Sequence, residues 1–198
     1  MEKTRKAGQS EATRSALVAV ARELFAERGY AAVGTKEIVQ RARVTRGALY
    51  HHFRDKKDLF RAVHEQLESE LAEELGRQLA EGPAGDPIAL LSAGGRAFLD
   101  HCMDPALARI ALVDAPSVLG WEEWRKVGER YGLGLVVAGL QAAMAAGVLR
   151  EQPVKPLAHL LFGALGEAGM LIANAGDPKA AREEIEPAML ALLEGLRV

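Results

Sequence analysis

The chain has few cysteines and few aromatic residues, and both shortages narrow its class. Cys102 is the single cysteine among 198 residues, which excludes an internal disulfide and a zinc site built on cysteines and leads us to expect a reducing, cytoplasmic location. Residues 1–14 are polar and charged, so we expect no secretory signal. Aromatic residues make up 5%, and no alternating run of β-branched residues reaches strand length. The sequence therefore predicts an all-α fold.

Signatures of catalysis and of membrane insertion are also missing. The segment 29–36 resembles a phosphate-binding loop only superficially, because its Thr and Lys stand in reversed order and no strand precedes it. We find no nucleophile elbow, zinc-protease helix or Cys/His pair, and we therefore expect no enzyme, no cofactor and no metal site. The apolar stretches 133–149 and 157–175 contain Gln141 and Glu167 in mid-span. We interpret both as buried or interface helices of a soluble protein that does not enter a membrane.

The net charge of −2 argues at first against a nucleic-acid partner, but the charge is divided unevenly along the chain. Residues 1–64 carry 14 basic and seven acidic side chains, a net charge of +7, whereas the remainder carries 11 basic and 20 acidic side chains, a net charge of −9. A polyanion is attracted to the first part and repelled by the second. We infer that the first third of the chain faces nucleic acid.

Apolar residues recur at helical spacing along most of the chain, and about nine helices are expected. Gly29 ends the first helix, and Thr35 and Thr45 are the expected N-caps of two short helices. Asp55 opens a long helix, with Asp58 three residues later in capping-box position. After a Gly/Pro-rich loop at 82–87, further helices are expected near 88–102, 105–114, 121–147, 155–175 and 179–196.

The most informative segment is GTKEIVQRARVTRGALYHHFRDK, residues 34–56. Two short helices about three residues apart have the geometry of a helix-turn-helix, whose second helix enters the major groove of DNA. Their inward positions are apolar: Ile38, Val39, Val44, Leu49 and Phe53. The outward positions of the second helix are suited to phosphates or base edges: Arg46, Gly47, Tyr50 and His51. Thr35 and Lys56 stand at the N-termini of the flanking helices, where backbone N–H groups bind phosphates.

These residues resemble the DNA-binding domain of the tetracycline-repressor-type (TetR) family of bacterial transcription regulators. The resemblance covers residues 12–62 and rests on ALVAVARELFAERGY, TKEIVQRA, VTRGALYHHF and DKKDLF. It implies an N-terminal helix-turn-helix domain over residues 1–55, with the motif at about 34–53, and an effector-binding and dimerisation domain over 56–198. It also implies a cytoplasmic homodimer that binds a palindromic operator.

The resemblance implies DNA-contacting roles for seven residues. Thr35, Tyr50, His51 and Lys56 would contact phosphate. Thr45, Arg46 and Gly47 would lie against the bases or the adjacent backbone. The sequence departs from the family at Arg43, where glycine is usual in the turn. We expect Arg43 to bear or avoid a left-handed conformation that glycine adopts freely.

The C-terminal part suggests a dimer interface. The segment 157–175 is apolar nearly all round, so it must be covered on more than one side. Together with 185–196 it can form a four-helix bundle across a two-fold axis. The resemblance implies the same interface, formed by the two C-terminal helices.

An effector pocket is expected among the middle helices. Trp121 and Trp124 are one turn apart and can share a wall. Glu167 interrupts an apolar run and needs a partner, which could be an effector cation, Arg125, His101 or a group across the dimer. The candidate lining residues are Phe98, His101, Cys102, Met103, Trp121, Trp124, Arg125, Tyr131, Met144, Phe162, Glu167 and Met170.

The function expected is that of a sequence-specific DNA-binding regulator, a repressor released from its operator by a small, lipophilic or aromatic effector. The effector would rotate the helix at 56–80, which joins the pocket to the DNA reader. A ligand-independent regulator or an activator is the first alternative. An enzyme or ligand-carrier module is the second.

Overall fold

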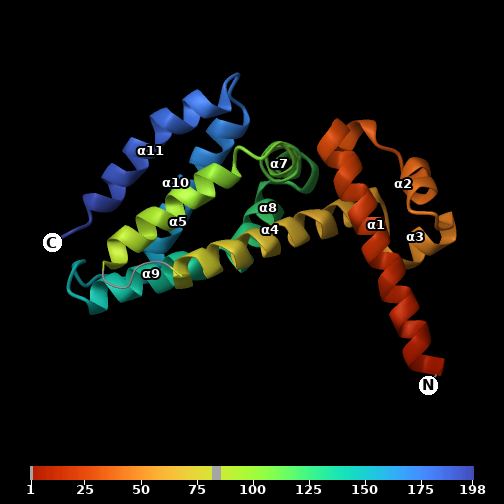
Figure 1. Cartoon of the computed structure of the whole chain (residues 1–198), viewed down its shortest axis with the longest axis horizontal. Helices are drawn as coiled ribbons and strands as arrows, with labels where there is room; N and C mark the ends of the chain where they lie inside the picture. The colour runs from red at the N-terminus through yellow and green to blue at the C-terminus, as the bar shows by residue number, and fades with distance from the viewer. Residues whose placement is uncertain (1, 82–85) are drawn as a thin grey trace.

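The computed structural model describes residues 2–81 and 86–198, with side chains from Gly8 onward. No strand occurs in these ranges, and the all-α prediction is confirmed. Most of the loop expected at 82–87 lies outside the described residues. The chain forms an elongated molecule with a small head at one end and a larger body at the other (Figure 1).

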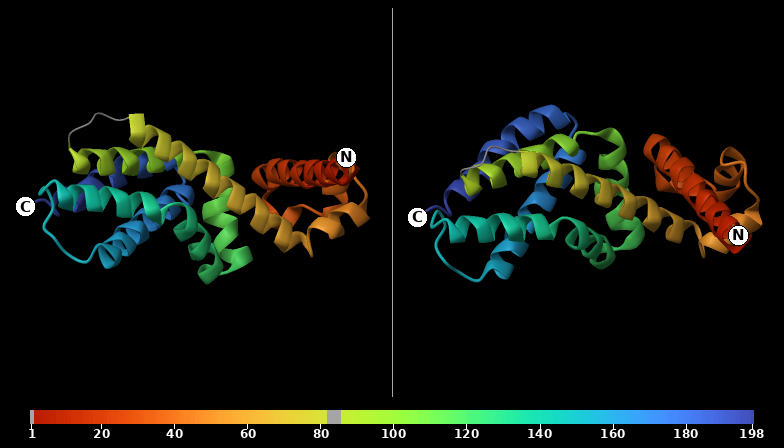
Figure 2. Two further views of the ribbon diagram at one scale, coloured as in Figure 1. Left: turned by 90° about the horizontal axis from the view of Figure 1, so that it is seen from below. Right: turned by 60° about the horizontal axis from the view of Figure 1, so that its bottom comes forward.

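The head contains α1 (Glu2–Ala32), α2 (Thr35–Arg41) and α3 (Arg46–His52). The long helix α4 (Lys56–Glu81) starts in the head and continues through the body, and both further views of the molecule show this arrangement (Figure 2). The body is completed by α5 (Pro87–His101), α6 (Pro105–Leu107), the π-helical segment η1 (Ala108–Asp114), α7 (Ala115–Leu119), α8 (Trp121–Tyr131), α9 (Leu133–Ala145), α10 (Val154–Ala173) and α11 (Pro178–Glu194).

An aromatic cluster joins α1 to α4 in the head. Phe25 and Phe60 are fully buried with ring centroids 5.3 Å apart, and Tyr30 packs edge-on against Phe60 at 5.1 Å. Burying each phenylalanine contributes roughly 1.5–3 kcal/mol. Leu59 and Val63 extend the same buried face of α4. The first two turns of α4 therefore belong to the core of the head, although the helix itself continues into the body.

The start of α4 follows the predicted capping pattern. The backbone N–H of Asp58 donates to Oδ1 of Asp55 at 2.7 Å, and Oδ2 of Asp58 accepts from the backbone N–H of Arg54 at 3.0 Å. Both carboxylates lie at the positive end of the helix dipole. The hydrogen bond from the Arg54 backbone N–H lowers the pKa of Asp58. The two hydrogen bonds fix the point at which α4 begins.

α1 is interrupted at Gly29, as its sequence position predicts, and a further turn follows. Gly29 has a φ of +78°, a conformation that L-residues rarely adopt. A Cβ atom there would lie 3.1 Å from Nη1 of Arg109 and 3.4 Å from Oδ2 of Asp114. Glycine therefore permits both the turn and the close approach of η1 to the end of α1.

Two expected helices of the body are divided. The stretch 121–147 forms α8 and α9, which separate at Gly132, where a Cβ atom would lie 3.0 Å from the ring of Phe162. The stretch 105–114 forms α6 and the π-helical η1, and α7 follows with Pro116 near its start. These divisions arise from packing between helices, which short-range periodicity does not report.

Candidate functional site

α2, the turn after it and α3 form the predicted helix-turn-helix at the outer end of the head. Ile38 of α2 and Leu49 of α3 are fully buried, and they fix how the two helices pack on α1. Thr45 is the N-cap of α3, since its Oγ1 accepts from the backbone N–H of Ala48 at 3.1 Å. Phe53, which follows α3, is buried as well. The inward set expected from the sequence is thus the set that holds α3 in place.

Arg43 adopts the left-handed conformation that the turn requires, with a φ of +55°. Its backbone N–H donates to the carbonyl of Gln40 at 3.2 Å, and the N–H of Val44 donates to the carbonyl of Val39 at 3.0 Å. This pair of hydrogen bonds is a Schellman motif with Arg43 at the position that glycine usually occupies. Arg43 therefore bears the strain, and its exposed guanidinium group lies beside the turn.

The outer face of α3 presents polar groups to solvent. Arg46, Gly47, Tyr50 and His51 are exposed. The guanidinium carbon of Arg46 lies 5.5 Å from the ring centroid of Tyr50. Hydrogen bonding from Arg46 and then from Thr35 lowers the pKa of the Tyr50 phenol. The face combines a cation, an oriented phenol and an imidazole with open backbone at Gly47, a combination suited to a phosphate backbone and base edges.

Two residues at helix starts differ from the sequence expectation. Thr35 is the first residue of α2, and Gly34 is the N-cap, with no side-chain cap hydrogen bond. The side chain of Lys56 points away from the expected DNA face, because Nζ donates to the carbonyls of Tyr30 and Val33 at 2.7 Å each. Lys56 thus caps the end of α1, and its ammonium group lies 4.0 Å from the Tyr30 ring centroid. Only its backbone N–H, at the first turn of α4, keeps the expected position.

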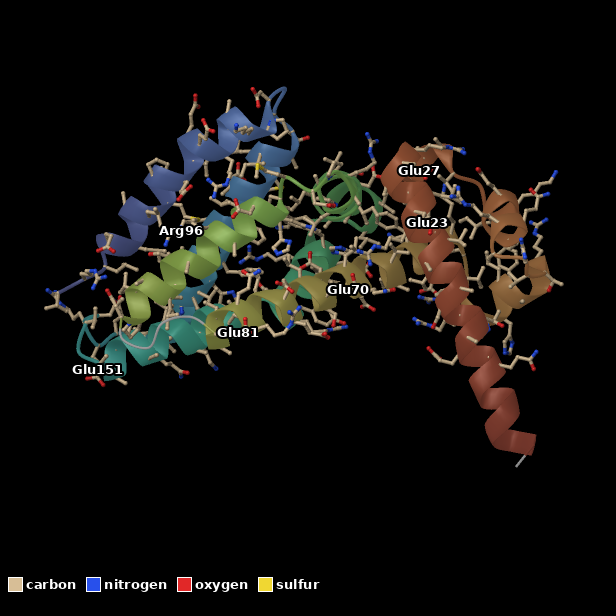
Figure 3. All side chains as sticks on the ribbon, viewed as in Figure 1. Glu23, Glu27, Glu70, Glu81, Arg96 and Glu151 are labelled. Carbon is tan, nitrogen blue, oxygen red and sulfur yellow. The ribbon has the colours of Figure 1, made fainter. Side chains whose placement is uncertain are left out.

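Acidic side chains of the head form ion pairs away from α3. Glu23 and Glu27 lie along α1 (Figure 3) and pair with Arg41 at 3.3 and 3.8 Å. Glu37 pairs with Arg28 at 2.6 Å. These pairs tie α1 to α2 and leave the exposed face of α3 to basic and neutral groups.

The body contains a partly open cavity of about 270 Å³ between α4, α5, α8, α9, α10 and α11. Its lining is mostly apolar. Seven of the residues expected from the sequence line it: Phe98, Trp121, Trp124, Arg125, Phe162, Glu167 and Met170. Leu71 and Leu75 of α4 belong to the wall too, so the helix that begins in the head forms one side of the cavity.

The other candidates are not among the residues that line this cavity: His101, Cys102, Met103, Tyr131 and Met144. Cys102 is buried in the main core, where burial raises the pKa of its thiol. Met103 packs on the same core, whereas Met144 packs on a second cluster around Leu140. Helical periodicity indicates which side chains face the interior of the body, but it does not say which of them line the cavity.

Glu68 of α4 lines the cavity and was not expected from the sequence. Its side chain is 17% exposed, and among the described residues it has no hydrogen-bond partner. Burial raises the pKa of its carboxyl group to about 7. His64, one turn earlier, is fully buried with no partner for either ring nitrogen in the described part of the chain, and burial lowers its pKa to about 4. Nδ1 of His64 lies 3.9 Å from Oε1 of Glu68.

Segment η1 contacts both the cavity and the head. The indole Nε1 of Trp124 donates to the carbonyl of Ala111 at 2.7 Å. Three residues later, Oδ2 of Asp114 accepts from the backbone N–H of Tyr30 at 2.7 Å. Leu112, between them, lines the cavity. α4 is thus not the sole connection between the cavity wall and the DNA-facing segment.

α10 has the length and hydropathy of a membrane span, yet it packs on α5, α9, α11 and η1. Its remaining outer face carries Leu160, 72% exposed, and Leu171, 54% exposed. These residues are eleven positions apart, about three helical turns, and so share one face. Leu192 of α11 is exposed as well. The two C-terminal helices therefore present an uncovered apolar surface.

Within residues 2–81 and 86–198, no three His, Cys, Asp or Glu side chains gather closely enough to hold a metal ion.

Comparison with known proteins agrees with this geometry. Residues 17–63 match the family model described as bacterial regulatory proteins of the tetR family, and residues 88–196 match the model of the tetracyclin repressor-like C-terminal domain. The fold and the site define a helix-turn-helix, DNA-binding transcriptional regulator. More narrowly, the chain belongs to the TetR family, whose members are regulators and not enzymes.

Relatives support this assignment over most of the chain. The chain is 31% identical over 157 residues to the transposon Tn10 TetC protein of Escherichia coli, covering 77% of this chain and 76% of that protein. It is 38% identical over 96 residues to the regulator AcrR of Shigella flexneri, covering 48% of this chain and 42% of that protein. A crystal structure of a TetR-family regulator from Pectobacterium atrosepticum shares 36% identity, covers 96% of this chain and 97% of that one, and gives a TM-score of 0.85.

Proposed function

We propose that this regulator is a homodimeric repressor that leaves a palindromic operator when a small molecule enters the cavity. The observation that carries the proposal is that the cavity is walled by α4 and η1, both of which contact the head. A ligand that binds better when the cavity is wider or narrower also favours the head orientation that goes with that cavity shape. A ligand switch requires such a difference in affinity between two conformations.

The proposed DNA contacts lie on α3 and at the two flanking helix starts. Arg46 and Gly47 meet base edges or the adjacent backbone, together with Thr45. Tyr50, His51 and Thr35 contact phosphate, and the backbone N–H of Lys56 binds a further phosphate at the start of α4. The exposure of the α3 residues and the coupling of Arg46 to Tyr50 support these roles.

The dimer is proposed to form through α10 and α11. A second copy covers Leu160, Leu171 and Leu192 and completes a four-helix bundle. Two-fold symmetry would also place two copies of α3 in successive major grooves, about 34–36 Å apart. From the sequence, we expect the domain boundary at residue 55/56. Because Leu59, Phe60 and Val63 pack in the head, we propose that the DNA-binding domain also includes the first two turns of α4, and that the protein is cytoplasmic.

DNA binding is tested with the DNA upstream of the regulator's own gene, measured by fluorescence anisotropy. Arg46→Ala and Tyr50→Phe should each weaken binding by about 1–3 kcal/mol per site, and affinity should fall steeply with salt. Arg150→Ala, an exposed arginine of the body, is the matched control and should bind like the parent. If both head variants bound this DNA as tightly as the parent, the assignment of α3 as the recognition helix would be refuted.

Repression and release are tested with a reporter gene behind the same DNA. Deleting the regulator should raise expression, and a ligand found by thermal shift should do the same in the parent strain. Lower expression after deletion would identify an activator instead. A ligand that stabilises the protein but leaves operator binding unchanged would favour the ligand-independent alternative.

A further inference from the structure

We propose that the effector is a hydrophobic amine whose ammonium group is bound by the carboxylate of Glu68. The inference rests on the proposed function, because it specifies the chemistry of the molecule that occupies the cavity. It follows from the charges of the lining, the aromatic side chains around them and the size of the space.

The charged groups of the lining favour a cation. Its charged side chains are Glu68, Arg125 and Glu167. Arg125 is already paired, since its Nε donates to Oε1 of Glu129 at 2.9 Å. Glu68 and Glu167 have no hydrogen-bond partner in the described part of the chain, and Glu68 is the more deeply buried of the two. A desolvated carboxylate gains most from a ligand that supplies a positive charge and hydrogen-bond donors.

The groups around Glu68 leave its charge uncompensated at neutral pH. His64 of α4 is uncharged there, because burial holds its pKa near 4. The thiol of Cys102, directly after α5, is also uncharged, since burial and then Glu68 raise its pKa. Glu123 of α8 is paired with Arg61. A bound ammonium group would therefore be the main cation facing this carboxylate, and it would lower the pKa that burial has raised.

Aromatic side chains supply the rest of an ammonium site. Phe98, Phe162, Trp121 and Trp124 line the same cavity, and the two tryptophan centroids lie 4.9 Å apart. Aromatic faces attract cations, and the attraction is stronger where water is excluded. Arg125 already shows this contact, with its guanidinium carbon 5.9 Å from the Phe162 centroid.

The volume limits the ligand to a small molecule. About 270 Å³ lies just below the ~300–1,000 Å³ range of small-molecule sites. A fused aromatic ring system with one aminomethyl group fits this space and this lining. A carboxylate or phosphate of the same size would face Glu68 and Glu167 and is disfavoured.

The test compares three probes of one shape: 2-naphthylmethylamine, 2-naphthylmethanol and 2-naphthoate. Binding at pH 8 is followed by the fluorescence of Trp121 and Trp124, both in the wall. The amine should bind about tenfold more tightly than the alcohol, and the acid most weakly. Glu68→Gln should abolish the preference for the amine and leave the affinity for the alcohol within about twofold. Glu73→Gln, an exposed carboxylate of the same helix, is the control and should keep the preference.

Calorimetry at pH 7 in buffers of different ionisation enthalpy gives an independent measurement. Amine binding should release a fraction of a proton in the parent and none in Glu68→Gln, because the ammonium group stabilises the ionised carboxylate. Proton uptake would mean that Glu68 binds ligands as a neutral hydrogen-bond donor, and it would overturn the inference. Equal affinity for amine and alcohol, or failure of the amine to bind, would overturn it as well.

Failure of this inference can be told apart from failure of the proposed function. Operator release is measured separately by anisotropy with each probe. If the amine binds through Glu68 without releasing DNA, the ammonium site stands and the release mechanism fails. If only the alcohol binds and releases DNA, the release mechanism stands and the ammonium site fails.

Discussion

Replacing Arg43 by glycine should stabilise the protein. Arg43 has a φ of +55° at the position of the Schellman motif that normally holds glycine. The left-handed conformation costs a non-glycine residue about 1–2 kcal/mol, and glycine loses about 0.5–1 kcal/mol more conformational entropy on folding. The net gain in the free energy of unfolding is therefore about 0–1.5 kcal/mol, centred on about 0.75 kcal/mol, and the central value corresponds to a rise in Tm of roughly 1.5–3 °C at this chain length.

Arg43→Ala separates the backbone effect from the charge. Alanine removes the guanidinium group but keeps the left-handed strain, so its stability in urea denaturation followed by circular dichroism should stay close to that of the parent. Arg43→Gly should be more stable than both the parent and Arg43→Ala. If Arg43 also binds phosphate, both variants should lower the salt dependence of operator binding by about one ion, and by the same amount. Equal stability of the glycine and alanine variants would refute the strain argument.

Further predictions concern the buried titratable pair and the dimer. The pKa of Glu68 rises from its ordinary 4.5 to about 7 on folding, so stability is lost as pH rises between these values. In urea denaturation, the free energy of unfolding of Glu68→Gln should be higher than that of the parent by up to about 3 kcal/mol at pH 8 and equal to it at pH 4. The pKa of His64 falls from 6.5 to about 4 on folding, so stability is lost as pH falls between these values. The free energy of unfolding of His64→Leu, relative to that of the parent, should therefore be higher at pH 4–5 than at pH 7. An equal difference at both pH values would contradict the burial of His64 as a neutral imidazole. For the proposed dimer, Leu171→Glu should give a monomer in sedimentation velocity, whereas Glu73→Gln should sediment like the parent. A dimer that persists in Leu171→Glu would exclude the Leu171 face of α10 from the interface.

The head could be predicted from the sequence because local rules determine it. The Thr45 cap, the Asp55–Asp58 capping pattern and the strained turn at Arg43 each involve residues within a few positions of one another. Lys56 shows where local rules fail. Its side chain caps carbonyls 23 and 26 positions earlier, a contact that depends on how α4 packs against α1.

The cavity was predicted only in part for the same reason. Glu68 stands among several acidic residues of α4 and has the pattern of a solvated helix surface. Its burial arises from α5 and α8, which approach α4 only in the folded body. Phe98, Trp124 and Phe162 could be predicted because large aromatic side chains are rare in this sequence and must be covered somewhere. Cys102 was also expected to line the cavity, yet it packs in the core.

The contacts of η1 constrain how the head moves. The carbonyl of Ala111 and the carboxylate of Asp114 are held by Trp124 and by the end of α1, respectively. Together with α4 they close a ring that runs from the cavity to the head and back. A rotation of α4 alone would strain both the hydrogen bond from the Tyr30 N–H to Asp114 and the packing of η1 on α1, so we expect the head and η1 to move as one body or to separate along this contact. In the proposed release, the strength of this contact would add to the energy that a bound ligand must supply to reorient the head.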